Sequence, residues 1–219
     1  MSAAAVIIIG AGGHATVVAD TLLARGTRVL GFTDADASRH GSKVCGLPVL
    51  GDDRILAKYN RSEVLLANGV GSVGRAVAGL NSRRTVQQSL AEHGWRFSAV
   101  VHPTAIVSPF AQIAGSVQLF AGSIVQPGAR IGEGCIVNSG AIVEHDVVLG
   151  DFTHVAPGAV VCGDVSIGED CHIGAGAVVR QALRLGSATV IGVGAVVVSD
   201  CPGQCVLVGV PAKPLEQRQ

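Results

Sequence analysis

Residues 142–179 read "IVEHDVVLGDFTHVAPGAVVCGDVSIGEDCHIGAGAVV", a segment of small and aliphatic side chains that also holds three histidines. An aliphatic residue returns at every sixth position, and this period extends to both sides of the segment. The series has seventeen members without an insertion: Val101, Val107, Ile113, Leu119, Val125, Ile131, Val137, Val143, Leu149, Val155, Val161, Ile167, Ile173, Val179, Leu185, Ile191 and Val197. A short fixed period of this kind predicts a solenoid.

Two further positions of the six-residue repeat have their own residue types. Four residues after each aliphatic comes a mostly small side chain, as in Ala129, Cys135, Ala141, Thr153, Ala159, Cys171, Ala177 and Ala195. Three residues after it comes Gly or Asp, as in Gly122, Gly128, Gly134, Gly140, Asp146, Gly158, Asp164, Asp170, Gly176 and Gly194. Gly and Asp tolerate the positive φ that a tight corner requires.

The small residue and the next aliphatic lie two positions apart, so both point inward from one short strand. The Gly or Asp then turns the chain to the next face. Three hexads make a triangular coil of eighteen residues, and stacked coils pair as parallel strands about 4.8 Å apart. We therefore expect an all-β parallel β-helix over residues 99–219.

Composition excludes several classes of protein. Sixteen basic and sixteen acidic residues balance, which does not favour nucleic acid or an anionic membrane as a partner. No apolar run approaches the roughly 20 residues of a membrane span. The N-terminus has no basic region before its apolar segment, and six cysteines in a chain of 219 residues favour reduced thiols. We expect a cytoplasmic protein.

Residues 1–98 predict an α/β domain. "VIIIGAGGHATVVADTLLARG" (6–26) is typical of a buried strand, a glycine turn and a helix, and its Gly10, Gly12 and Ala15 match a phosphate-binding fingerprint. "RVLGFTDAD" (28–36) gives a second strand that ends at Asp34, a position suited to contact a ribose or a base. "EVLLANGVGS" (63–72) gives a third strand and a glycine loop, followed by a helix from about Val73 to His93.

The length of this domain limits its ligand. There is room for one mononucleotide-binding, Rossmann-like half and not for the two halves that a dinucleotide needs. A nucleotide-sugar therefore fits better than NAD. An ordinary strand–helix turn without a ligand would give the same glycine pattern.

His145 lies two residues after Val143, at a corner where its ring can reach solvent. Gly163 follows eighteen residues later, one coil up at the same corner, with its backbone N–H near the imidazole. A general base beside a backbone donor suits acyl transfer, because the donor can stabilise the thioester oxyanion. A surface histidine without a catalytic role is the alternative.

The chain resembles known families in both parts. The hexads "IGEGCI", "IGEDCH" and "IGAGAV" and the closing "VGVPAKP" are similar to the left-handed β-helix acyltransferases. The handedness comes from this resemblance, since parallel crossovers are generally right-handed. The order "GAGGHA", "FTDAD", "VVHPTAIVSP" resembles the bacterial sugar acyltransferases of the sialic-acid O-acetyltransferase and bacillosamine N-acetyltransferase type, over nearly the whole chain.

The resemblance implies roles for individual residues. "EHD" (144–146) is similar to the family's catalytic segment, with His145 as the base and Asp146 as the acid that raises its basicity. Asp146 is also a corner residue that the repeat explains, and Glu144 could replace it as the partner. In the family the N-terminal domain binds the nucleotide-sugar, and the matching positions here are Gly12, Gly13, His14, Asp34, Ala35, Gly69 and Ser72.

The resemblance also implies an acetyl-CoA site. His154 is assigned to it, Ala175 and Val193 match coenzyme contacts, and Gly163 supplies its N–H. His154 precedes an inward residue and so projects outward from a flat face, with His172 stacked eighteen residues on; a pair of surface imidazoles is the alternative. Relatives bind the coenzyme between the chains of a trimer. We expect a homotrimer here, because the outward faces carry Val147, Val148 and Val160 among few charges.

We therefore expect an acetyl-CoA-dependent N-acetyltransferase that acts on a nucleotide-linked amino sugar, of the 4-amino-4,6-dideoxy type, for a bacterial surface glycan or glycoprotein. O-acetylation of sialic acid or another sugar is the alternative, and a non-catalytic scaffold is a third. A zinc carbonic-anhydrase-like β-helix is a distant one. Such enzymes need a close pair of histidines and a distant third, whereas the spacings here are 9 and 18, so no metal is expected.

The cysteines give one geometric prediction. Cys135 and Cys171 are thirty-six residues apart, two coils in one inward column, about 9–10 Å and beyond the reach of a disulfide. Cys201 and Cys205 in "DCPGQC" could form a loop disulfide or half a metal site, but two reduced thiols are the simpler interpretation.

Overall fold

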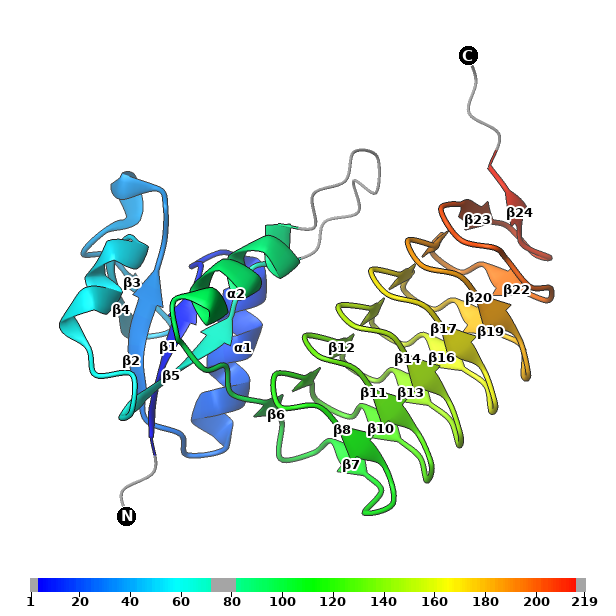
Figure 1. The fold of residues 1–219 in the computed structure, drawn as a ribbon, viewed down its shortest axis with the longest axis horizontal. Helices are drawn as coiled ribbons and strands as arrows, with labels where there is room; N and C mark the ends of the chain where they lie inside the picture. Colours follow the sequence, from blue (N-terminus) through cyan, green and yellow to red (C-terminus); the bar gives the residue numbers. More distant parts are fainter. Residues whose placement is uncertain (1–3, 72–81, 216–219) are drawn as a thin grey trace. The chain divides into compact units, whose positions relative to one another are not determined.

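The computed structural model describes residues 4–71 and 82–215, which form two compact units (Figure 1). By contacts within the chain, the first unit ends at Pro103 and the second begins at Thr104.

The first unit is an α/β domain built on a five-stranded sheet of order β3-β4-β2-β1-β5. Parallel pairing joins β1 to β2 and β5, and β2 to β4, whereas β3 is antiparallel to β4. Its elements are β1 (Ala5–Ile9), α1 (Gly13–Ala24), β2 (Val29–Thr33), η1 (Ala37–Arg39), β3 (Lys43–Val44), β4 (Leu47–Gly51), η2 (Asp53–Lys58), β5 (Val64–Asn68), α2 (Ser82–Glu92) and β6 (Val100–Val101).

The three predicted strands and the helix after the glycine turn are confirmed as β1, β2, β5 and α1. The helix expected from Val73 is described from Ser82, and residues 73–81 lie outside the described part. Sequence analysis did not identify the β3–β4 hairpin. Its turn residues Cys45 and Gly46 have φ of 49° and 75°, the left-handed pair of a two-residue hairpin.

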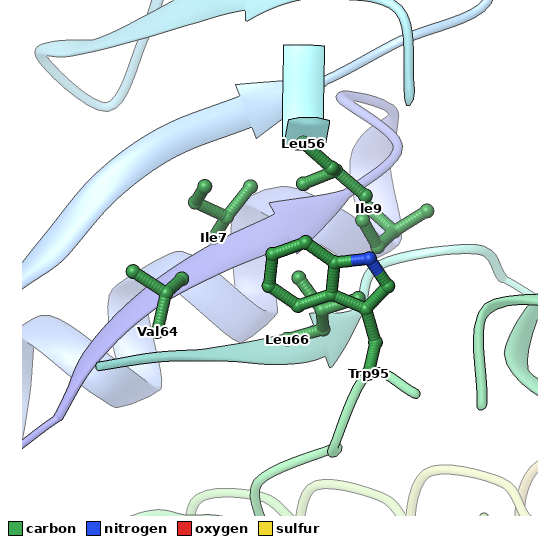
Figure 2. Close-up of a cluster of buried hydrophobic side chains, with 6 residues drawn as sticks. All are labelled: Ile7, Ile9, Leu56, Val64, Leu66 and Trp95. Atoms are coloured by element: carbon green, nitrogen blue, oxygen red, sulfur yellow. The ribbon is translucent and has the colours of Figure 1, made fainter. Parts of the chain in front are cut away.

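An apolar cluster stabilises the sheet of the first unit (Figure 2). Every residue of β1 is buried, because helices and connections cover both faces of a parallel centre. Trp95, which follows α2 and is 6% exposed, packs in this cluster. The cluster comprises Ile7, Ile9, Leu56, Val64, Leu66 and Trp95.

The second unit is a parallel β-helix, as the period predicts, with strands of two residues on three faces (Figure 1). The first face is β7 (Ile106–Val107), β10 (Ile124–Val125), β13 (Ile142–Val143), β16 (Val160–Val161), β19 (Val178–Val179) and β22 (Val196–Val197). The second face is β8 (Gln112–Ile113), β11 (Arg130–Ile131), β14 (Val148–Leu149), β17 (Ser166–Ile167) and β20 (Arg184–Leu185). The third face is β9 (Gln118–Leu119), β12 (Ile136–Val137), β15 (His154–Val155), β18 (His172–Ile173) and β21 (Val190–Ile191).

The register confirms a coil of eighteen residues, since Ile124 pairs with Ile142 and Ile142 with Val160. All fourteen repeat aliphatics from Leu119 to Val197 are buried, and so are the small residues that follow them. Each Gly or Asp predicted at a corner has a positive φ, for example 60° at Asp146 and 59° at Asp164. One assignment was wrong: Val147 is fully buried, because it occupies the inward position four residues after Val143.

The C-terminal segment closes the last coil. β23 (Val206–Val208) pairs with β21, and β24 (Lys213–Pro214) pairs antiparallel with β23. The backbone of Cys201 forms an isolated parallel β-bridge with Leu185. Its side chain forms a disulfide with Cys205, so the expectation of two reduced thiols here was wrong. Neither Cys135 nor Cys171 forms a disulfide with another of the described residues.

Candidate active site

His145 stands at the corner between the first and second faces, two residues after the end of β13. Its Nδ1 lies 2.9 Å from Asp146 Oδ2, and the two side chains are 61% and 65% exposed. Because a carboxylate only accepts hydrogen bonds, Nδ1 carries the proton of the neutral ring and Nε2 keeps its lone pair. The hydrogen bond to Asp146 raises the pKa of His145, and the charges of Asp146, Glu144 and Asp164 raise it further.

The His145 ring lies against the backbone of the next coil. A Cβ added to Gly163 would be 2.5 Å from Nε2, so only glycine leaves room for the ring in this position. The N–H of Asp164 donates to the carbonyl of His145 over 3.0 Å, which fixes the two corners to each other. The N–H of Gly163 makes no hydrogen bond with the described residues. A basic nitrogen and a backbone donor are therefore neighbours.

His154 has a different environment, on β15 of the third face. It is only 8% exposed, so the interpretation as one of two surface imidazoles was wrong for this ring. Its Nε2 lies 3.1 Å from Asn138 Nδ2, and its ring packs edge to face on His172 with 5.0 Å between centroids. Since the amide nitrogen donates, Nε2 accepts and Nδ1 carries the proton. Sequence analysis did not identify Asn138. The signal that could have found it is a polar side chain sixteen residues before His154, in the coil below.

The chain alone does not bring His145 and His154 together. One ring occupies the corner between the first two faces, and the other occupies the third face of the same coil. Ala175 and Val193 lie one coil apart at the corner that follows the third face, where Gly194 N donates to the Ala175 carbonyl over 2.9 Å. The Val193 side chain is 82% exposed.

In the first unit, the N-terminus of α1 presents an open backbone surface. Gly12 is the N-cap, no side chain caps the helix and no acidic residue lies in its first turn. A Cβ at Gly12 or Gly13 would meet nothing within 4 Å. The N–H groups of the first turn and the helix dipole make this end suited to bind an anion. His14 follows in the first turn and is half-buried.

Asp34 supports the glycine turn. Its Oδ2 accepts from Ala11 N and its Oδ1 from Asp36 N, each over 2.9 Å. Arg39, which sequence analysis did not identify, donates from Nη1 to the Ala11 carbonyl over 2.7 Å. Ala35 is exposed beside them.

Gly69 has a packing role at the end of β5. A Cβ there would lie 2.7 Å from both Ala15 Cβ and Ile8 Cγ2. The strand order reverses between β1 and β5, and the ends of these two strands are where open α/β sheets bind ligands. Gly12, Gly13, His14 and Gly69 follow those ends, whereas Ser72 lies outside the described residues.

Within residues 4–71 and 82–215, no three His, Cys, Asp or Glu side chains form a group that could hold a metal ion. None of the helices in this part of the chain is both long and apolar enough to cross a membrane.

Each of the two units matches a known protein family. The family described as PglD N-terminal domain matches residues 5–77, and the family described as bacterial transferase hexapeptide (six repeats) matches residues 128–163 and 146–181. No curated protein matches the chain.

Solved structures match over nearly the full length. The acetyltransferase domain of PglB from Neisseria gonorrhoeae is 37% identical, with a TM-score of 0.87 over 96% of this chain and 99% of that one. PerB from Caulobacter crescentus, solved with CoA and GDP-perosamine, is 35% identical, with a TM-score of 0.88 over 98% and 99%. WeeI from Acinetobacter baumannii shares the fold at 23% identity and a TM-score of 0.76, over 96% of this chain and 99% of that one. The chain belongs to the left-handed β-helix sugar acetyltransferases, in which a PglD N-terminal domain precedes hexapeptide repeats.

Proposed function

We propose that the protein transfers the acetyl group of acetyl-CoA to the amino group of a nucleotide-linked amino sugar, of the 4-amino-4,6-dideoxy type. The observation that carries this proposal is the arrangement at one corner: Asp146 holds His145 Nδ1 while Nε2 faces Gly163. The two relatives solved with acetyl coenzyme A and with CoA and GDP-perosamine support the same pair of substrates.

His145 acts as the general base. Its Nε2 takes a proton from the acceptor nitrogen as that nitrogen attacks the thioester carbonyl. The Gly163 N–H stabilises the oxyanion that forms, because it has no competing partner among the described residues. When the tetrahedral intermediate collapses, its C–S bond breaks, and the proton on Nε2 passes to the leaving thiolate.

The first unit holds the nucleotide. The α1 N-terminus at Gly12, Gly13 and His14 receives a phosphate, and its lack of a side-chain cap supports this role. Asp34 and Ala35 lie beside the turn and contact the nucleoside. Gly69 acts indirectly, since its lack of a Cβ lets the end of β5 pack against Ala15 of α1.

The coenzyme lies along the third face, with contacts from His154, Ala175 and Val193. The exposed Val193 side chain and the ordered His154 ring support this path. His145 is on the opposite corner of the same chain, so base and coenzyme site meet only if a second chain completes the site. We place the reaction in the cytoplasm, where acetyl-CoA is available.

A homotrimer that packs through the first face would complete the site. The outward residue of every strand on that face is aliphatic: Ile106, Ile124, Ile142, Val160, Val178 and Val196. The second face instead carries Gln112, Arg130, Val148, Ser166 and Arg184. A continuous apolar stripe on one of three faces is typical of a subunit interface.

Two measurements test these proposals. Acetyl transfer from acetyl-CoA to a panel of nucleotide-linked 4-amino sugars should give product; no transfer to any of them, with transfer to sugar hydroxyls instead, would contradict N-acetylation.

Val160→Glu should convert the trimer to monomers in sedimentation and abolish activity. Ser166→Glu, six residues on in the same coil, is the control and should leave the trimer intact.

A further inference from the structure

Asp164 directly follows the glycine that lies against the catalytic ring. Asp146 occupies the Nδ1 side of His145, at 2.9 Å, and Gly163 occupies the Nε2 side. Asp164 directly follows Gly163, and its N–H is bonded to the His145 carbonyl over 3.0 Å. An acid thus follows the glycine that lies against the basic nitrogen.

The carboxylate of Asp164 has no structural partner among the described residues. Asp164 is exposed and takes the corner conformation with a φ of 59°. Its side chain forms no hydrogen bond or ion pair with the described residues, whereas the equivalent corner acid one coil below, Asp146, is bonded to His145. The corner conformation requires only a residue that tolerates positive φ, which Ala182 fulfils one coil above with 61°. The repeat therefore allows an Asp at this corner but does not require its charge.

Among the described residues, three negative charges raise the pKa of His145: Asp146, Glu144 and Asp164. An amino group on a sugar ring has electron-withdrawing oxygens nearby, so its pKa lies near that of an α-amino group, about 8, and it is largely protonated at neutral pH. The acceptor of the proposed reaction therefore reaches this corner mostly as a cation. A hydroxyl acceptor would be neutral.

We propose that Asp164 determines the acceptor class, by binding the ammonium form of the amino group beside His145 Nε2 and so favouring amines over hydroxyls. This inference rests on the proposed N-acetyltransferase function. The ammonium first loses one proton to solvent. The neutral amine then attacks the thioester carbonyl and forms the N–C bond, and its second proton goes to Nε2. The C–S bond breaks, and the leaving thiolate takes this proton from Nε2. The products are the amide, the thiol and the one proton that was released to solvent.

The test compares two ligands that differ only in the acceptor group: a nucleotide-linked 4-amino sugar that the wild type acetylates, and its 4-hydroxy analogue used as a competitive inhibitor. At pH 6.5 the wild type should bind the amine more tightly. Asp164→Asn should lower the affinity for the amino sugar about tenfold, the usual contribution of a hydrogen bond between charged groups. It should leave the inhibition constant of the hydroxy analogue unchanged. At pH 9, where the amine is neutral, the difference between wild type and variant should shrink.

Asparagine tolerates the corner conformation, so the variant should fold. Asp170→Asn, at another corner with a φ of 55°, is the matched control and should leave the affinity for both ligands unchanged. The inference is overturned if Asp164→Asn keeps the wild-type preference for the amine, or if it weakens both ligands equally. Failure of the wild type to acetylate any amino sugar would instead overturn the proposed function.

Discussion

Two histidines nine residues apart on one coil have opposite surroundings. His145 is at a corner, 61% exposed and bonded to a carboxylate, whereas His154 is on a flat face, 8% exposed and bonded to an amide. The carboxylate raises the pKa of His145 and leaves Nε2 open to a reactant. The Asn138 amide occupies Nε2 of His154.

The difference shows how one repeat separates proton transfer from binding. A corner side chain has no neighbour on its outer side, so it can approach a substrate and titrate. A side chain on a face is held by the residues of the coils above and below. Substitutions at the two positions should therefore change different kinetic constants.

The largest effect is expected at the corner. His145→Ala should lower kcat by about 10²–10⁴-fold, the usual contribution of a general base, with little change in KM for acetyl-CoA. Steady-state assays down to low pH would measure this, because an amine already deprotonated could mask the loss. His93→Ala removes another exposed ring, whose Nδ1 lies 2.7 Å from the Ser89 carbonyl oxygen, and should be neutral. Wild-type turnover of His145→Ala across the pH range would contradict the assignment of the base.

Gly163→Ala tests the contact between corner and backbone. The added Cβ would lie 2.5 Å from Nε2, so the ring must move and kcat should fall about 10–100-fold while KM for acetyl-CoA changes less. The control is Gly115→Ala, where a Cβ meets nothing nearer than Glu133 Oε1 at 4.0 Å. Equal turnover in the two variants would show that the ring position is not critical.

His154→Ala should act on binding. KM for acetyl-CoA should rise about tenfold with a smaller change in kcat, since the ring is assigned to the coenzyme. Loss of the ring also leaves the Asn138 amide without this partner, which should cost about 1–3 kcal/mol and lower Tm. Titration of coenzyme A binding by calorimetry gives the direct measurement. If kcat alone fell, the division between corner and face would be wrong.

The smallest effect is expected for Asp146→Asn. Asn keeps the positive φ but loses the charge, so the raised pKa of His145 should decrease. The base is active only when unprotonated, so the acidic limb of the kcat/KM profile should move to lower pH. The rate at higher pH should fall several-fold because the base is weaker. An unchanged profile would mean that Asp146 serves only as a corner residue.

Sequence alone predicted the β-helix well, because each hexad position has one physical requirement: an aliphatic interior, a small interior residue and a corner that tolerates positive φ. It could place His145 over Gly163, since both belong to one column. It could not predict the burial of His154, because the period fixes direction and not what covers a side chain. The β3–β4 hairpin and the Arg39 contact to Ala11 were missed, since neither repeats nor has a fixed spacing.

The closing segment has a consequence for solubility. A stack of parallel coils ends in unpaired strand edges, which can add strands from another molecule and grow into fibres. Here each edge of the last coil is covered: Cys201 bridges to β20, Gly209 and Ala212 bond to Val196 of β22, and β23 covers β21. The final strand β24 runs antiparallel and includes Pro214, which has no N–H to offer. The same segment that ends the coil thus blocks polymerisation at that end.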